Sequence, residues 1–171
     1  MLRIVSFMGA SLELDDELFY YASFDYWVKI NWDKRQVDFG LTPASNIKEG
    51  GYRSLEYFLE EGETVTPGDP LALAITAKIK YLDVVAGGVV VALNRELEQN
   101  TASCQNATGD SCWLASINAD DEGKMLPGLI DFNQYLKMLR HYEKHAIPPG
   151  SKYSVSPTCK SVYESIRKQK E

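Results

Sequence analysis

The sequence contains few of the residues that usually build metal sites. There are only two histidines, His141 and His145, and three cysteines, none of which form a Cys-x-x-Cys pair. The two histidines lie four residues apart but lack the glutamate of a His-Glu-x-x-His motif. We therefore expect no metal site, and we expect both histidines to lie on a solvated helix surface.

The odd number of cysteines does not suit a disulfide framework. Cys104 and Cys112 lie eight residues apart in the polar segment TASCQNATGDSC. Disulfides are rare in cytoplasmic proteins, so we expect free thiols. A disulfide between these two cysteines, or a thiol-based function of the pair, is the alternative.

Long apolar runs and excess positive charge are also missing. No run approaches the roughly 20 apolar residues needed to span a bilayer, and Ile4–Met8 is too short for a secretory signal. The 18 Lys and Arg residues are outnumbered by 24 Asp and Glu, which gives a net charge of -6. Binding to nucleic-acid phosphates requires a basic surface. We expect a cytoplasmic protein, or one of the mitochondrial matrix if eukaryotic, with no membrane and no nucleic-acid partner.

Motifs for self-contained catalysis are absent. The sequence has no Gly-rich phosphate loop and no Gly-x-Ser-x-Gly elbow. Its carboxylates are scattered through turns. We therefore expect no catalytic residues in this chain, although its 171 residues, 44% of them hydrophobic, are enough for a core of its own.

Alternating apolar residues predict mainly strands. Residues 26–41 read as a hairpin, because Val28, Ile30 and Trp32 alternate with polar residues before a turn. Thr42-Pro43 predicts the start of a short helix that Gly50-Gly51 ends. Further strand candidates are residues 52–59, 71–76, 84–93 and 112–117, and Gly88 in the third of these is expected to form a kink.

The C-terminal part favours helix. Asp131 and Gln134 form a capping box, and an apolar stripe with helical spacing follows it: Phe132, Tyr135, Leu136, Leu139 and Tyr142. Residues 151–171 read as a polar tail whose end has helical character. The pattern predicts a mostly β (α+β) fold, a small sandwich or flattened barrel with helices at its ends. We expect Trp27, Trp32 and Trp113 in or beside the core.

The segment GETVTPGDPLALAITAK, residues 62–78, resembles the lipoyl-lysine hairpin of the glycine cleavage system H protein family. In that family a turn G-x-x-V-x-x-G-(D/E) precedes a strand that ends in Glu-Ser-Val-Lys, and this lysine carries lipoate. The lysine is the tenth residue after the second turn glycine. Here the tenth residue after Gly68 is Lys78.

The resemblance continues in the same order along residues 20–139. The matching segments are Asp25-Tyr26-Trp27-Val28, Gly40-Leu41-Thr42, Gly88–Asn94, Trp113-Leu114 and the helical residues 131–139. The chain departs from the family at the glutamate three residues before the lysine, which is Ile75 here. Asp25 stands for a family histidine, and the hairpin is one residue short between Lys78 and Gly88. If the hairpin tip is shifted, Lys80 is the second candidate.

The resemblance implies a flattened β-barrel of the lipoyl-domain type, with a short internal helix and a C-terminal helix. It implies a carrier domain at residues 20–145, an N-terminal extension at 1–19 and a polar tail at 146–171. It also implies lipoate bound covalently to Lys78, with the strands at 71–76 and 84–93 as the arms of the hairpin.

The partners implied are glycine decarboxylase, aminomethyltransferase and dihydrolipoyl dehydrogenase. The alternative is an H-like scaffold or binding module that has lost the carrier role.

Overall fold

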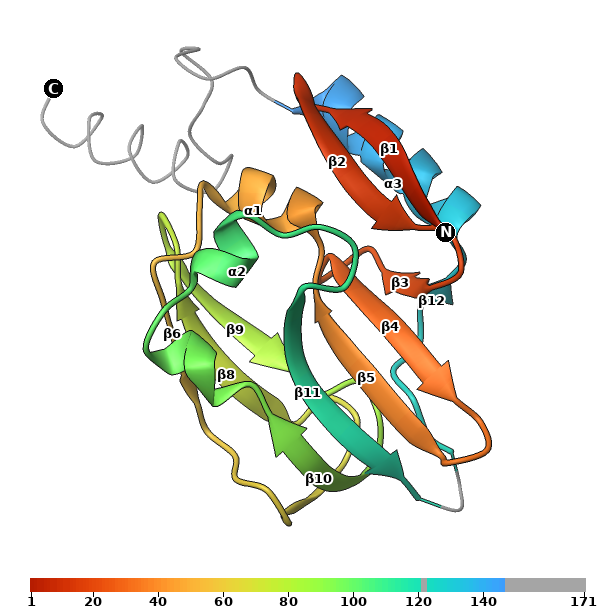
Figure 1. The fold of residues 1–171 in the computed structure, drawn as a ribbon, viewed down its shortest axis with the longest axis vertical. Coiled ribbons are helices and arrows are strands. Elements are labelled where there is room, and N and C mark those ends of the chain that lie inside the picture. The colour runs from red at the N-terminus through yellow and green to blue at the C-terminus, as the bar shows by residue number, and fades with distance from the viewer. Residues whose placement is uncertain (121–122, 147–171) are drawn as a thin grey trace, which may run out of the picture.

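The computed structural model describes residues 1–120 and 123–146, and strands dominate it (Figure 1). A seven-stranded antiparallel sheet forms the largest layer. Its strands are, in order across the sheet, β12 (Leu129–Ile130), β3 (Phe19–Tyr21), β4 (Tyr26–Asn31), β5 (Gln36–Leu41), β11 (Cys112–Ala119), β10 (Gly88–Leu93) and β7 (Thr64–Val65). A second sheet contains β6 (Ser54–Tyr57), β8 (Pro70–Ile75) and β9 (Ile79–Asp83), and β1 (Leu2–Phe7) and β2 (Ala10–Asp15) form a separate hairpin.

The two helices predicted at Thr42-Pro43 and Asp131 begin where the sequence places them. Helix α1 (Pro43–Glu49) has Thr42 as its N-cap, whose side chain accepts a hydrogen bond from the Ser45 N–H, and Gly50 ends it in the left-handed conformation. Helix α3 (Phe132–His145) begins with the capping box of Asp131 and Gln134. Two shorter helices, η1 (Arg95–Glu98) and α2 (Ala102–Gln105), lie between β10 and β11. No helix in the described part of the chain is long and apolar enough to cross a membrane.

The main core lies between the seven-stranded and the three-stranded sheets. Leu71, Ala74 and Leu82 of the smaller sheet are fully buried in the same cluster as Phe39 and Ile117 of the larger sheet. Burial of apolar surface contributes about 25 cal/mol per Å², so this shared core is what fixes one sheet against the other.

A second core joins the first hairpin to the last helix. Phe7 and Leu14 from β1 and β2 pack with Tyr135 and Leu139 from α3, and Trp27 of β4 belongs to the same cluster. The apolar stripe predicted for residues 132–142 is therefore confirmed as a packing face. Figure 1 shows the β1–β2 hairpin and α3 together at one end of the molecule.

The predicted strand at 84–93 is only partly present. Strand β10 covers Gly88–Leu93, and residues 84–86 form a buried connection between the sheets. The Val84 N–H donates to the Asp69 carbonyl, and the Leu126 N–H donates to the Val85 carbonyl. Residues 84–86 are apolar because they form a buried connection. Hydrophobic periodicity alone does not distinguish such a connection from a buried strand.

Two further predictions concern single residues. Gly88 has a φ of 148°, and a Cβ there would overlap the Asn118 carbonyl, so this position requires glycine, although the register of β10 shifts between Val90 and Ala92 and not at Gly88. Trp32 is 75% exposed, because it lies in the turn between β4 and β5. The expectation that it belongs to the core was wrong, whereas Trp27 is buried.

The prediction of free thiols at Cys104 and Cys112 was also wrong. The two residues form a disulfide that links α2 to the start of β11, and both are buried. The tertiary fold brings their Cα atoms to 4.8 Å, within the range that a disulfide requires.

We expect the disulfide to stabilise the folded state. Closing a loop of this length contributes about 2.5 kcal/mol in the chain-entropy model. Urea denaturation with and without reductant measures this, and a variant with Cys104→Ser and Cys112→Ser serves as the control that reductant no longer affects. Equal midpoints for oxidised and reduced protein would contradict the expectation.

Because several tyrosines are buried, we expect the free energy of unfolding to fall at alkaline pH. Burial raises the pKa of Tyr21 to about 12 and holds the pKa of Tyr26 and Tyr135 well above the ordinary value of 10. Above pH 10 the unfolded chain therefore releases protons that the folded chain retains. The free energy of unfolding should fall by about 1.4 kcal/mol per pH unit for each such tyrosine.

Urea denaturation between pH 8 and pH 11.5 tests this, together with the ultraviolet absorbance of tyrosinate. Ionisation of Tyr21, Tyr26 and Tyr135 near pH 10 in the folded protein, together with the exposed tyrosines, would contradict it.

Candidate functional site

Lys78 lies in the tight turn that joins β8 to β9. Ile75 pairs with Ile79 across the base of this turn. The Thr76 N–H donates to the Lys78 carbonyl at 2.8 Å, and the Lys78 N–H donates to the buried Thr76 hydroxyl at 3.2 Å. These bonds fix the backbone of the turn, while the Lys78 side chain is 72% exposed.

The arms of this hairpin differ from the prediction in one respect. The first arm is β8, as expected from residues 71–76, but the second arm is β9 and not residues 84–93. Residues 79–83 carry no strong strand pattern, since only Leu82 among them is fully buried. The observed hairpin is shorter than the predicted one, and Lys78 lies at its tip.

Lys80 has a different environment from Lys78. Its side chain is only 14% exposed, and its ammonium donates to Glu49 Oε1 at 3.0 Å. The Lys78 ammonium lies 3.8 Å from the other oxygen of the same carboxylate, Oε2, which is beyond hydrogen-bond distance. Of the two candidate side chains, Lys78 is by far the more exposed, 72% against 14%.

Glu49 is a residue of this site that the sequence did not point to. It is the last residue of α1, and its side chain is 12% exposed. Its backbone carbonyl accepts a hydrogen bond from the Ala77 N–H at 3.4 Å, so both its main chain and its side chain contact the hairpin tip. Glu49 is far from the hairpin in the sequence, so no spacing pattern connects the two.

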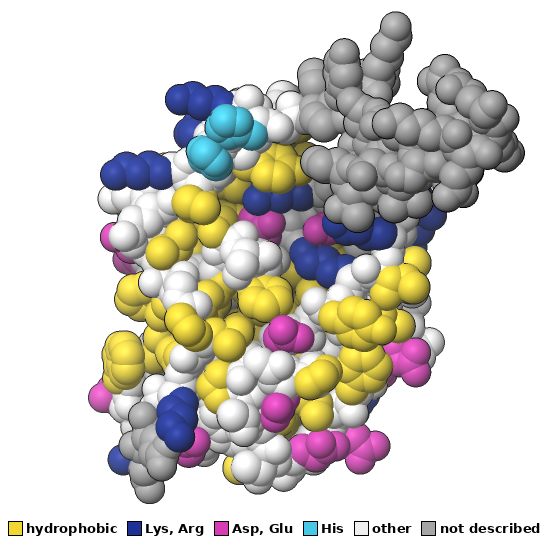
Figure 2. Space-filling model, turned by 180° about the vertical axis from the view of Figure 1, so that it is seen from behind, with side chains coloured by type: hydrophobic (Ala, Val, Ile, Leu, Met, Phe, Trp, Pro, Cys, Tyr) yellow, Lys and Arg dark blue, Asp and Glu magenta, His cyan; other side chains and the backbone are white. Residues whose placement is uncertain are grey.

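The outer face of the three-stranded sheet is apolar beside the tip. Ile79 and Tyr81 of β9 are 62% and 63% exposed, and the Phe58 and Tyr81 rings lie 6.3 Å apart. Ile75, at the position of the family glutamate, is half-buried on this face next to Ile79. The view from behind shows hydrophobic side chains close to Lys and Arg side chains on this side of the molecule (Figure 2).

Asp25 is the centre of a buried polar network that connects α1 with α3. Its Oδ1 accepts hydrogen bonds from Lys48 Nζ at 3.0 Å and from the Tyr135 hydroxyl at 2.8 Å. The Tyr135 and Thr42 hydroxyls are 2.9 Å apart. Burial, then the charge of Asp25, raises the pKa of Tyr135 well above its ordinary value, so this hydroxyl stays protonated and available as a donor.

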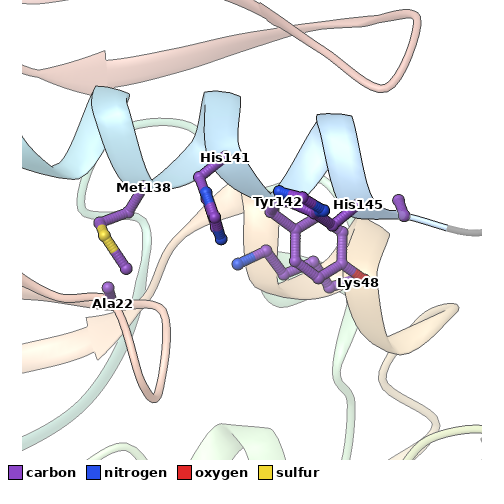
Figure 3. Close-up of a pocket in the computed structure, with 7 residues that line it drawn as sticks. Ala22, Lys48, Met138, His141, Tyr142 and His145 are labelled. Atoms are coloured by element: carbon purple, nitrogen blue, oxygen red, sulfur yellow. The ribbon is translucent and has the colours of Figure 1, made fainter.

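A pocket of about 570 Å³ opens beside this network between α3 and the end of α1. Lys48, Met138, His141, Tyr142 and His145 line it (Figure 3). The Lys48 ammonium lies 4.3 Å from the centre of the Tyr142 ring, within cation–π range. Both histidines are exposed, as predicted, with ring centres 4.4 Å apart.

The described residues contain no group of three or more His, Cys, Asp and Glu side chains that could hold a metal ion.

Comparison with solved structures finds a related architecture. A glycine cleavage system H protein from Mycobacterium marinum matches with a TM-score of 0.62 and 19% sequence identity, covering 72% of this chain and 97% of that chain. The chain has an H-protein-like fold. The predicted mostly β architecture is therefore confirmed. No family model matches the sequence, so the likeness is one of fold.

Replacing Tyr135 by Phe should destabilise the protein by about 1–3 kcal/mol, because the buried Asp25 carboxylate loses a hydrogen-bond donor. The matched control is Tyr142→Phe on the same helix, since Tyr142 is 37% exposed, and substitutions of that kind usually change stability by less than about 0.5 kcal/mol. Denaturant unfolding of both variants gives the comparison. Equal losses would show that the Asp25 network contributes nothing specific.

Proposed function

We propose that this chain is a lipoyl-carrier protein of the H-protein type, with lipoate attached to Lys78. The observation that carries the proposal is the position of Lys78 at the tip of the β8–β9 hairpin, with its side chain 72% exposed. The H-protein-like fold supports it. The chain would act as a carrier between enzymes and not as an enzyme itself.

The tip suits the attachment of a swinging arm. An enzyme that modifies a lysine must enclose its side chain, which requires an exposed amine on a backbone that holds its shape. The Thr76 hydroxyl and the pairing of Ile75 with Ile79 supply that shape. When attached, lipoate would supply group-transfer and redox chemistry, while the protein orients and presents it.

Attachment also changes the charge at the tip. Acylation turns the Lys78 ammonium into a neutral amide, which removes its attraction to Glu49 at 3.8 Å. The pair is largely exposed on the Lys78 side, so its contribution to stability is small. Loss of this ion pair on acylation therefore costs the folded state little.

Partners and location follow from the same proposal. The partners would be glycine decarboxylase, aminomethyltransferase and dihydrolipoyl dehydrogenase, in the cytoplasm or the mitochondrial matrix. The net charge of -6 would favour basic docking surfaces on these enzymes by steering association. We assign the carrier domain to residues 20–145, with 1–19 as an N-terminal extension. The tail beyond residue 146 lies outside the described residues.

A second candidate function is a scaffold that no longer carries lipoate. Ile75 favours it, because a hydrophobic side chain replaces the family glutamate beside the attachment lysine. Such a module would use the apolar face with Ile79 and Tyr81 for binding, and the arm would be absent.

Lipoylation gives the deciding measurement. The full chain, incubated with lipoate, ATP and a lipoate-attaching enzyme, should gain the mass of one lipoyl group, located at Lys78 by peptide mapping. The variant Lys78→Arg should gain none, and Lys80→Arg should be modified like the wild type. An unmodified wild-type chain under these conditions would favour the scaffold.

A further inference from the structure

Two lysines at the hairpin tip share one carboxylate but differ in access. Lys78 lies in the turn and is 72% exposed, whereas Lys80 lies on β9 and is 14% exposed. They lie two residues apart on one short hairpin. The local surroundings of each lysine therefore influence which of them is acylated.

Glu49 forms a hydrogen bond with the Lys80 ammonium but not with the Lys78 ammonium. The Lys80 ammonium donates to Glu49 Oε1 at 3.0 Å, and both side chains of this pair are largely buried. Hydrogen bonds between charged groups are stronger than neutral ones, so Lys80 must lose a strong contact before its nitrogen can reach a reagent. Lys78 makes no comparable bond to Glu49, because 3.8 Å exceeds hydrogen-bond distance.

Glu49 also carries an unused acceptor. Its Oε2 is buried, and within residues 1–120 and 123–146 no donor forms a hydrogen bond with it. A buried acceptor of this kind usually has a partner. Of the two Glu49 oxygens, Oε2 is the one beside the Lys78 nitrogen.

We propose that Glu49 selects the acylation site, by holding Lys80 and by offering Oε2 to the amide that forms at Lys78. The inference rests on the proposed function for the biological role of this amide. Ile75 leaves β8 without a carboxylate at the family position, and Glu49 supplies one from α1 instead.

The covalent step needs an activated carboxyl compound as co-reactant. The neutral amine nitrogen of Lys78 attacks the carbonyl carbon, the new C–N bond forms, and the bond to the leaving group breaks with its electron pair. The amine loses one proton to solvent. The product amide has a single N–H, which a rotation of the side chain brings to Glu49 Oε2.

Chemical acylation tests the selection without any partner enzyme. The full chain is treated with the N-hydroxysuccinimide ester of acetic acid, and the acetylation rates of Lys78, Lys80 and the exposed Lys29 are followed by peptide mapping. In the wild type Lys80 should react about tenfold more slowly than Lys78, a factor that corresponds to about 1.4 kcal/mol. In Glu49→Ala the rate of Lys80 should rise about tenfold, since its charged hydrogen bond is lost, while Lys29 is unchanged.

The control variant is Glu56→Ala, which removes an exposed carboxylate from the neighbouring strand β6 and should leave all three rates unchanged. If circular dichroism shows that Glu49→Ala is unfolded, Glu49→Gln replaces it, with a smaller rise at Lys80. Equal rates at Lys78 and Lys80 in the wild type, or an unchanged ratio in the folded Glu49 variant, would overturn the selection.

The role of Oε2 has a readout of its own. In the wild type with acetylated Lys78, the N–H of the new amide should exchange with deuterium more slowly than in the acetylated Glu49→Ala protein, as measured by NMR. Equal exchange rates would overturn this part. A chain that shows the acetylation ratio but gains no lipoyl group would contradict the proposed function and leave the selection by Glu49 in place.

Discussion

The packing of the three-stranded sheet against the seven-stranded sheet holds the candidate site in place. Strands β8 and β9 bury Leu71 and Leu82 in the common core and expose Ile79 and Tyr81 on the other side. A hairpin of two strands is marginally stable in isolation. Its buried face is therefore what gives the tip a fixed direction, and Lys78 owes its defined position to a core that lies several residues away.

Helix α1 connects this core to the second one. Its last turn carries Lys48 and Glu49 in sequence, and these neighbouring residues serve opposite sides. Lys48 binds Asp25, which α3 reaches through Tyr135, while Glu49 binds the hairpin tip. The N-terminal hairpin, α3 and the tip are thus linked through one short helix, whose ends are set by the Thr42 cap and by Gly50.

The residues at which the chain departs from the H-protein pattern make other contacts. Ile75 contributes to the apolar surface beside Lys78, and Glu49 of α1 places a carboxylate oxygen 3.8 Å from the Lys78 ammonium. Asp25, in place of the family histidine, pairs with Lys48 and so is satisfied although it is buried. The disulfide between Cys104 and Cys112 holds α2, whose Gln105 side chain donates to the Tyr52 carbonyl just after α1.

Local signals in the sequence determined the starts of α1 and α3, the end of α1 and the hairpin at residues 26–41, because caps and turns depend on neighbouring residues. The resemblance to the H-protein family, and no local signal, pointed to Lys78. The sequence did not reveal strand β9, whose half-exposed residues lack a strong pattern, nor the pairing of the two cysteines. The contacts of Glu49 with Lys78 and Lys80, and of Asp25 with Lys48 and Tyr135, join residues 23 to 110 positions apart. Only the tertiary structure decided these, because they form when separate elements pack together and not through any local preference of the chain.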